Sequence, residues 1–204
     1  MTVLKFAMKA LVPMVLATSA FAFPDGAYIE DVAHGGNGCP QGTVGTLLST
    51  DKQKLSIFFD EYLADTADSR SGRVRKSCNI GVSVHVPQGF TVALLKLDYR
   101  GFVEVPKGGS ANLTADYFFA GRRAGDSFRK KWGKRNRSVE QEINLSNSFY
   151  GGTLIRSRCG ESVIIRANTS IRAKDSNHGD AYIQVDTIDA SAAIVYQLQW
   201  KRCY

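Results

Sequence analysis

Hydrophobic and polar residues alternate along much of the chain, which is the pattern of strands that bury one face. In the segment CNIGVSVHV, Ile80, Val82, Val84 and Val86 fall on one face and His85 falls on the other, toward solvent. A similar alternation, or a short apolar run, recurs in eight more segments: LSIFF, TVALLKLDY, FVEV, ANLTADYFF, SVEQEINL, SVIIRANTSI, AYIQVDTI and AIVYQLQW.

Turn-forming sequences separate these segments. They are PQG at 87–89, YRG at 99–101, PKGG at 106–109, YGG at 150–152 and SNHGD at 176–180. Leu94 and Leu95 break the alternation, which predicts a bulge or a strand buried on both faces. Residues 60–68 are the one stretch that would suit a short helix. About nine short strands predict an all-β fold, an antiparallel β-sandwich of the jelly-roll or Ig-like kind, with a barrel as the alternative closure.

Residues 1–22 have the features of a secretion signal. Two lysines precede an apolar run, and Ala20 and Ala22 stand at the −3 and −1 positions of a cut after Ala22. The run is short for a membrane span. We therefore expect residues 1–22 to be a signal peptide and residues 23–204 to be a single secreted β domain. The alternative is an uncleaved N-terminal anchor.

The four cysteines all follow the predicted signal. An even number of cysteines in an exported chain predicts disulfides, for which three pairings exist. We favour Cys39–Cys78 and Cys159–Cys203, which place one disulfide in each half of the chain. Each would close a loop of about 40 residues and contribute about 4 kcal/mol. A zinc site is the weaker alternative, since no two cysteines have close spacing. The sequence indicates no cofactor and no metal.

The positive charge of the chain is concentrated in one segment. The whole chain has a formal charge of +7, and residues 122–137 carry eight basic residues against Asp126. Gly121 just before this segment, Gly125 and Gly133 within it, and the lack of periodicity predict a long loop there. Its candidate binding residues are Arg122, Arg123, Arg129, Lys130, Lys131, Trp132, Lys134, Arg135 and Arg137. A smaller cluster, comprising Arg70, Arg73, Arg75 and Lys76, would join this face only if the fold brought the two together.

Cations interleaved with aromatic residues suit an anionic partner. The candidates are an acidic polysaccharide, lipopolysaccharide or an anionic membrane surface, with nucleic acid less favoured. Phe128 and Trp132 would stack on sugars or bases or enter an interface. The competing interpretation is a loop whose charges are simply solvated.

Catalytic signals are sparse. The three histidines, His34, His85 and His178, match no catalytic motif. The carboxylates that would serve acid–base chemistry are Asp60, Glu61, Asp98, Asp116, Glu140 and Glu142. Asp175, Asn177 and Asp180 are hard oxygen ligands of the kind that bind calcium, but a turn between two strands explains them equally well.

Seven motifs occur in one order along the chain: GNGCPQGTV, LSIFFDEYLA, RKSCNIGVSVHVPQGF, VALLKLDYRGFVEVPKG, ADYFFAG, RCGESVIIRANTSI and VDTIDAS with YQLQWKRC. From about Gly36 to Cys203 they resemble the secreted domain-of-unknown-function 4360 family. The resemblance implies an exported protein with four cysteines at these positions and implies no activity. In the family pattern Gly-Pro turns follow ADYFFAG, so the basic segment is a feature of this chain.

These observations favour a secreted, non-enzymatic β-sandwich that binds an anionic or glycan surface outside the cell through its basic loop. One alternative is a secreted effector or toxin that acts on a protein partner. A hydrolase of polysaccharides, built from scattered carboxylates, is less favoured.

Overall fold

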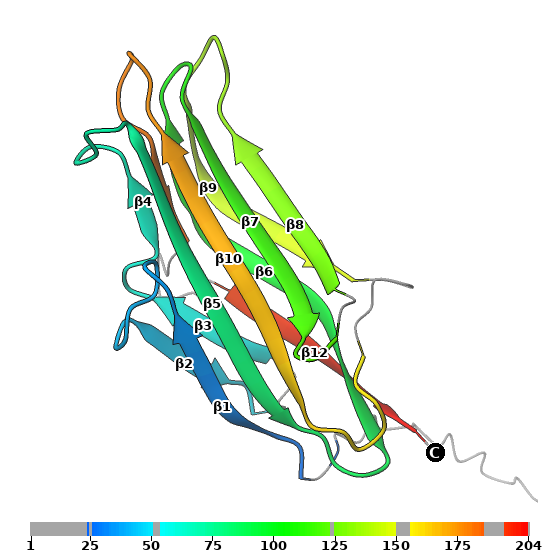
Figure 1. Cartoon of the computed structure of the whole chain (residues 1–204). Coiled ribbons are helices and arrows are strands. Elements are labelled where there is room, and N and C mark those ends of the chain that lie inside the picture. Colours follow the sequence, from blue (N-terminus) through cyan, green and yellow to red (C-terminus); the bar gives the residue numbers. More distant parts are fainter. Residues whose placement is uncertain are drawn as a thin grey trace, which may run out of the picture.

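The computed structural model describes residues 24, 26–50, 54–122, 125–149, 156–185 and 194–203. These residues form strands and no helix (Figure 1). The strands are β1 (Tyr28–Gly35), β2 (Val44–Leu48), β3 (Lys54–Phe59), β4 (Leu63–Asp65), β5 (Arg73–His85), β6 (Phe90–Val105), β7 (Ser110–Phe119), β8 (Gly125–Trp132), β9 (Val139–Ser148), β10 (Val163–Lys174), β11 (Tyr182–Gln184) and β12 (Ile194–Arg202).

The strands form two antiparallel sheets that lie face to face (Figure 1). The five-stranded sheet has the order β1-β5-β10-β7-β8. The seven-stranded sheet has the order β2-β3-β12-β6-β11-β4, and β9 pairs with β6 as well. The protein is therefore an antiparallel β-sandwich, as the alternation of its residues predicts.

The core lies between the two sheets and takes the apolar half of each alternating strand. In β5, Val82 and Val84 are 1% exposed, whereas His85 on the opposite side keeps 38% of its side chain exposed. Across the sandwich, the ring of Tyr99 in β6 stacks on that of Phe128 in β8, with centroids 5.8 Å apart. Each large apolar side chain buried in this way contributes about 1.5–3 kcal/mol.

The longest strand joins two segments that the sequence separates. TVALLKLDY and FVEV are both parts of β6, so the turn predicted at residues 99–101 is wrong. A Cβ on Gly101 would lie 2.0 Å from the carbonyl oxygen of Gln184, which shows that this glycine lets β11 approach β6, where β11 pairs with residues 102–104. The bulge expected near Leu95 is present, because the register with β12 skips that residue.

Other local expectations have mixed outcomes. The helix expected at residues 60–68 is wrong, because β4 forms there and pairs with β11, a partner more than a hundred residues later. The turns at 87–89, 106–109 and 176–180 lie between strands as predicted. The turn predicted at 150–152 lies outside the described residues.

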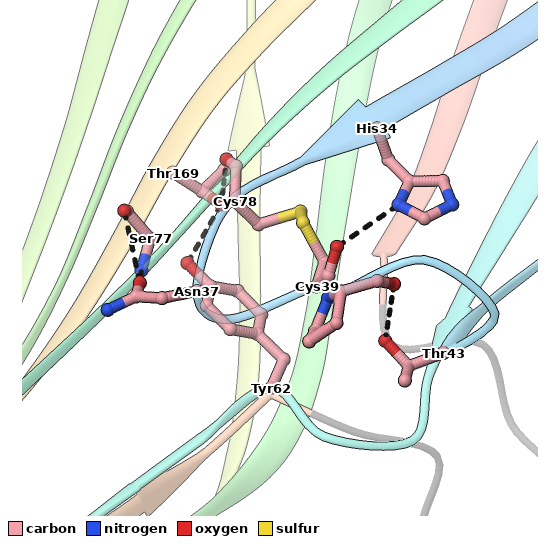
Figure 2. Close-up of a disulfide and its surroundings, with 9 residues drawn as sticks. His34, Asn37, Cys39, Thr43, Tyr62, Ser77, Cys78 and Thr169 are labelled. Atoms are coloured by element: carbon pink, nitrogen blue, oxygen red, sulfur yellow. Dashed lines mark hydrogen bonds between the residues drawn. A yellow bond between two sulfur atoms is a disulfide. The ribbon is translucent and has the colours of Figure 1, made fainter.

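The stretch GGNGCPQGT forms a tight turn that carries the first disulfide (Figure 2). Cys39 and Cys78 are fully buried. Gly36 has a φ of 141°, and a Cβ there would meet the carbonyl oxygen of Ser77 at 2.2 Å. A Cβ on Gly38 would lie 2.5 Å from the ring of Tyr62. Both glycines are therefore required by the close approach of the turn to β5 and to Tyr62.

The second disulfide joins Cys159, just before β10, to Cys203, just after β12. Cys159 is exposed, unlike the buried pair at the first disulfide. The two bonds are the pairs that the sequence favours. They close sequence separations of 39 and 44 residues, one in each half of the chain.

Candidate functional site

Half of the basic segment at residues 122–137 is strand, so the segment is not one long loop. Residues 125–132 form β8, which pairs with β7 at the edge of the five-stranded sheet. The loop prediction was wrong because the backbone of β7 supplies the hydrogen-bonding partner for β8, and that partner is not visible in local composition. Only residues 133–138 form the connection to β9.

The strand divides the predicted binding residues between its two faces. Arg129 and Lys131 lie on the outer face of the five-stranded sheet, while Lys130 and Trp132 lie on the opposite side of β8, as the registers with β7 require. In the connection to β9, three cations are exposed: Lys134, Arg135 and Arg137. Arg123 lies outside the described residues.

Two predicted binding residues have structural roles instead. Trp132 is only 5% exposed and belongs to the core, so it offers no platform for stacking a ligand. Arg122 donates a hydrogen bond to the carbonyl oxygen of Arg156 at 2.7 Å and lies 3.6 Å from a carboxylate oxygen of Glu161. Its guanidinium also lies 5.7 Å from the ring centroid of Phe119.

The fold brings part of the second basic cluster onto the same face as β8. In the antiparallel register Arg172 of β10 lies opposite both Arg75 of β5 and Asn112 of β7, and Asn112 lies opposite Lys131 of β8. Residues that lie opposite one another on neighbouring strands form a cross-strand row, and this row of four strands carries three cations. We define the cationic face as the exposed side chains of Arg73, Arg75, Arg129, Lys131, Arg172 and Lys174.

Two members of the cationic face were not identified from the sequence. Arg172 and Lys174 stand singly in β10, so local charge density does not reveal them. The signal that identifies them is the alternation of SIRAK, in which Ile171 and Ala173 are buried and the two cations point to the other side. The other members of the smaller cluster lie elsewhere: Lys76 is on the inward side of β5 and Arg70 is in the preceding turn.

The cations of this face repel one another. Arg75 lies opposite Arg172, and Arg73 lies opposite Lys174. Like charges directly opposite on neighbouring strands destabilise a sheet. Among the described residues, none of the six cations has a carboxylate oxygen within ion-pair distance. The side chain of Arg75 is oriented by a hydrogen bond of 3.1 Å that its Nε donates to Ser170 Oγ.

A shallow groove of about 350 Å³ runs over this cluster. It is lined by Arg73, Arg75, Asn112, Arg172 and Lys174, together with Ser110 and two small apolar residues. The acids on the outer face of the same sheet are Glu30, which lies 3.7 Å from His85, and Asp31 and Asp116, and none of them lies on the cross-strand rows of the cationic face. The groove thus offers donors from three strands and no acceptor carboxylate.

Of the candidate catalytic carboxylates, only Glu140 and Glu142 share a face, the exposed outer side of β9, as their spacing predicts, and the others lie apart from them. Asp60 and Glu61 are exposed neighbours in a turn, and Asp116 is exposed on the five-stranded sheet. Asp98 is the one with an organised environment. Partial burial raises its pKa, but hydrogen bonds from Lys96, Ser146 and Gln197 and the charge of Lys96 together bring the pKa below its ordinary value. Asp98 is therefore ionised at neutral pH and unsuited to donating a proton.

The histidines and the oxygen ligands considered for calcium have ordinary surroundings. His85 stacks on Tyr28, with ring centroids 4.7 Å apart, and His34 Nδ1 lies 3.1 Å from the carbonyl oxygen of Cys39. Asp180 accepts a hydrogen bond of 3.2 Å from Thr66. Within the described part of the chain, no group of three or more His, Cys, Asp or Glu side chains is placed to hold a metal ion. The same part has no helix suited to crossing a membrane.

The fold and the site define a disulfide-bonded β-sandwich with one cationic face. Comparison with known proteins shows that the chain belongs to the family described as domain of unknown function DUF4360, whose model matches residues 25–203. An uncharacterized secreted protein of Arthroderma benhamiae is 28% identical over 183 residues, which cover 88% of this chain and 73% of the relative. The protein is secreted, in keeping with this relative and with its two disulfides.

One solved structure aligns along most of the sandwich. It is that of TmCBM61 in complex with β-1,4-galactotriose, with 12% sequence identity, a TM-score of 0.27, and coverage of 85% of this chain and 90% of the other. An overlap with this TM-score carries no argument about the ligand of this chain.

Proposed function

We propose that this secreted β-sandwich binds acidic polysaccharides through its cationic face. The observation that carries the proposal is the pairing of like charges, in which Arg75 lies opposite Arg172 and Arg73 lies opposite Lys174. Each such pair costs about 0.2–1 kcal/mol. A polyanion that lies across these strands is attracted by all six cations. It also reduces the repulsion between them, and this relief adds to the free energy of binding.

The arrangement of the cations supports a polymer as the ligand. Neighbouring strands lie about 4.8 Å apart, and alternate residues of one strand lie about 7 Å apart. The cationic face is thus a shallow, open array of regularly spaced charges and not an enclosed pocket for a single small anion. An extended chain with a charge on successive sugar units fits such an array.

The side chains around the cations disfavour the other anionic partners. On the cross-strand rows that contain them, the remaining described positions are Ser77, Ser110, Asn112, Thr114 and Ser170. None of these is aromatic, and base stacking is a main source of affinity for single-stranded nucleic acid. None is a large apolar side chain, which insertion into a membrane interface requires. Serine and asparagine instead donate hydrogen bonds to sugar oxygens.

The experiment uses the full chain, secreted from a host that forms disulfides, with heparin and alginate as probes and dextran as the neutral control. Two triple variants remove the same charge. The face variant is Arg75→Gln/Lys131→Gln/Arg172→Gln, and the connection variant is Lys134→Gln/Arg135→Gln/Arg137→Gln. We expect wild type to bind at least one acidic probe at about 0.15 M salt and to lose it with rising salt.

The face variant should lose at least about tenfold in affinity, and the connection variant should retain most of it. The proposal is wrong if neither acidic probe binds at physiological salt. It is also wrong if the connection variant loses affinity while the face variant does not, because the site would then be the exposed turn at residues 133–138.

A further inference from the structure

A second groove lies on the outer face of the seven-stranded sheet, away from the cationic face. It has a volume of about 520 Å³. Four strands contribute polar side chains to it: Lys54 from β3, Gln197 from β12, Lys96 and Asp98 from β6, and Asn144 and Ser146 from β9. The inward neighbours Leu97 and Tyr99 are buried, which shows that these polar residues take the solvent side of the same strands.

The centre of this groove is held by hydrogen bonds before any ligand arrives. Lys96 Nζ lies 2.8 Å from Asp98 Oδ1, and Gln197 Nε2 donates to Asp98 Oδ2 at 2.8 Å. Ser146 Oγ also donates to Asp98 Oδ1. The registers explain the contacts, since Ser146 lies opposite Asp98 and Gln197 lies opposite Lys96. A ligand therefore meets side chains whose rotamers are already ordered, which reduces the entropic cost of binding.

Further donors and acceptors in the groove are available to a ligand. Asn144 donates only one long hydrogen bond of 3.4 Å, to Glu142, which leaves its carbonyl oxygen available. The side chains of Lys54, Ser56 and Arg100 make no hydrogen bond or ion pair with another described residue. The groove thus mixes cations, a carboxylate, amides and hydroxyls, whereas the groove of the cationic face has no carboxylate.

An aromatic ring extends this polar strip along β6. Phe102 is the next outward-facing residue after Arg100 and is half-buried. It lies in register between Gln184 of β11 and Glu142 of β9. The distance along the strand from Lys96 to Phe102 is about 20 Å. The strip is therefore long enough for several linked sugar units.

We propose that this groove binds a neutral oligosaccharide. Sugar hydroxyls both donate and accept hydrogen bonds, and so require the mixture of amide, carboxylate and hydroxyl groups found around Asp98. The apolar face of a sugar ring packs on an aromatic ring such as that of Phe102. Lys96 is paired with Asp98, and the other cations of the strip, Lys54 and Arg100, are offset by Glu142 and Glu104 near Phe102. An acidic chain therefore gains little net attraction along this path. The two faces of the sandwich then hold different polymers, which would let one molecule link them.

The test uses the full disulfide-bonded chain and neutral hexasaccharides of β-1,3-glucose, β-1,4-glucose, β-1,4-galactose, β-1,4-N-acetylglucosamine and α-mannose. Binding is measured by calorimetry in about 0.5 M salt, which screens the cationic face. The variants are Phe102→Ala and Asn144→Ala. Asn144 is exposed, so its replacement keeps the test valid if removal of the Phe102 ring unfolds the protein. The matched control is the face variant Arg75→Gln/Lys131→Gln/Arg172→Gln.

We expect at least one hexasaccharide to bind with a Kd below about 1 mM. A variant that keeps its unfolding temperature should bind about tenfold more weakly, and the face variant should bind as wild type does. The proposal is overturned if no hexasaccharide binds at about 1 mM, or if neither well-folded variant weakens binding. Because the probes are neutral and the salt is high, a negative result in this test does not bear on the proposed binding of acidic polysaccharides. A negative result with heparin and alginate likewise does not bear on the binding of neutral oligosaccharides.

Discussion

The hydroxyl groups of Tyr62 and Thr169 lie 2.8 Å apart in the core although 107 positions separate the two residues in the chain. Thr169 Oγ1 donates its hydrogen to the carbonyl oxygen of Cys78 at 2.9 Å, so the hydrogen between the two hydroxyls comes from Tyr62 (Figure 2). This chain of bonds connects the segment before β4, the centre of β10 and the first disulfide. It satisfies polar groups that would otherwise be buried without partners.

We expect Tyr62→Phe to lower the free energy of unfolding by about 1 kcal/mol, the usual net contribution of one buried hydrogen bond. Thr169 keeps its bond to Cys78, so the remaining hydroxyl is still partnered. Urea unfolding at pH 7 measures the difference. A variant as stable as wild type would contradict the role assigned to this bond.

The burial of the Tyr62 hydroxyl predicts that the folded protein loses stability at alkaline pH. Burial raises the pKa of Tyr62 far above its ordinary value of 10.0, and the hydrogen bond with Thr169 and the charge of Arg75 offset only part of that rise. The unfolded chain ionises near pH 10 while the folded protein does not. The contribution of Tyr62 is therefore complete below pH 10 and decreases above it, by up to about 1.4 kcal/mol per pH unit.

The measurement is the free energy of unfolding of wild type and Tyr62→Phe from pH 8 to pH 11. The phenylalanine variant cannot ionise at this position, so the advantage of wild type should shrink once the pH exceeds 10. Other ionising groups cancel in the difference between the two proteins. A difference that stays constant across the whole range would show that Tyr62 titrates alike in both states.

Gly38→Ala should destabilise the protein by several kcal/mol, because the new Cβ would lie 2.5 Å from the Tyr62 ring. Gly45→Ala is the matched control. Its Cβ would meet Phe58 at 3.8 Å, an ordinary van der Waals distance, and its effect should stay within about 0.5 kcal/mol. Thermal unfolding of the two variants decides the prediction, and equal losses would refute it.

Arg172→Gln should raise stability slightly while it weakens the binding of acidic polymers. Removing the central cation relieves its repulsion from Arg75, which lies directly opposite, and is expected to stabilise the fold by about 0.2–1 kcal/mol at low salt. The gain should disappear at about 1 M salt, where charges are screened within a few ångströms. A loss of stability at low salt would indicate that the cations of this face do not repel one another as argued.

The two disulfides should differ in their sensitivity to reduction. Cys39 and Cys78 are fully buried, whereas Cys159 is exposed to an attacking thiolate. Mild treatment with dithiothreitol at pH 8, followed by alkylation and mass spectrometry, should label Cys159 and Cys203 before the other pair. Labelling of all four cysteines at one rate would instead indicate that reduction follows global unfolding.

Local patterns were sufficient for some elements and misleading for others. The alternation in ANLTADYFF and SVIIRANTSI predicts β7 and β10, because each buries one face and exposes the other. The charges and glycines of β8 predict a loop, and only its pairing with β7 makes it a strand. Its residue Trp132 looks like an exposed ligand-stacking residue in the sequence and is buried in the fold.

The sequence by itself determined the strand-rich class, the cysteine pairs that are favoured and the segment where positive charge is concentrated, because alternation, cysteine count and charge are properties of short stretches. Only the tertiary structure decided which cations share a face. Arg75, Lys131 and Arg172 come from three strands, and antiparallel pairing across β7 is what places them in one row. The groove around Asp98 likewise depends on the registers of β6 with β9 and β12, which no single segment specifies.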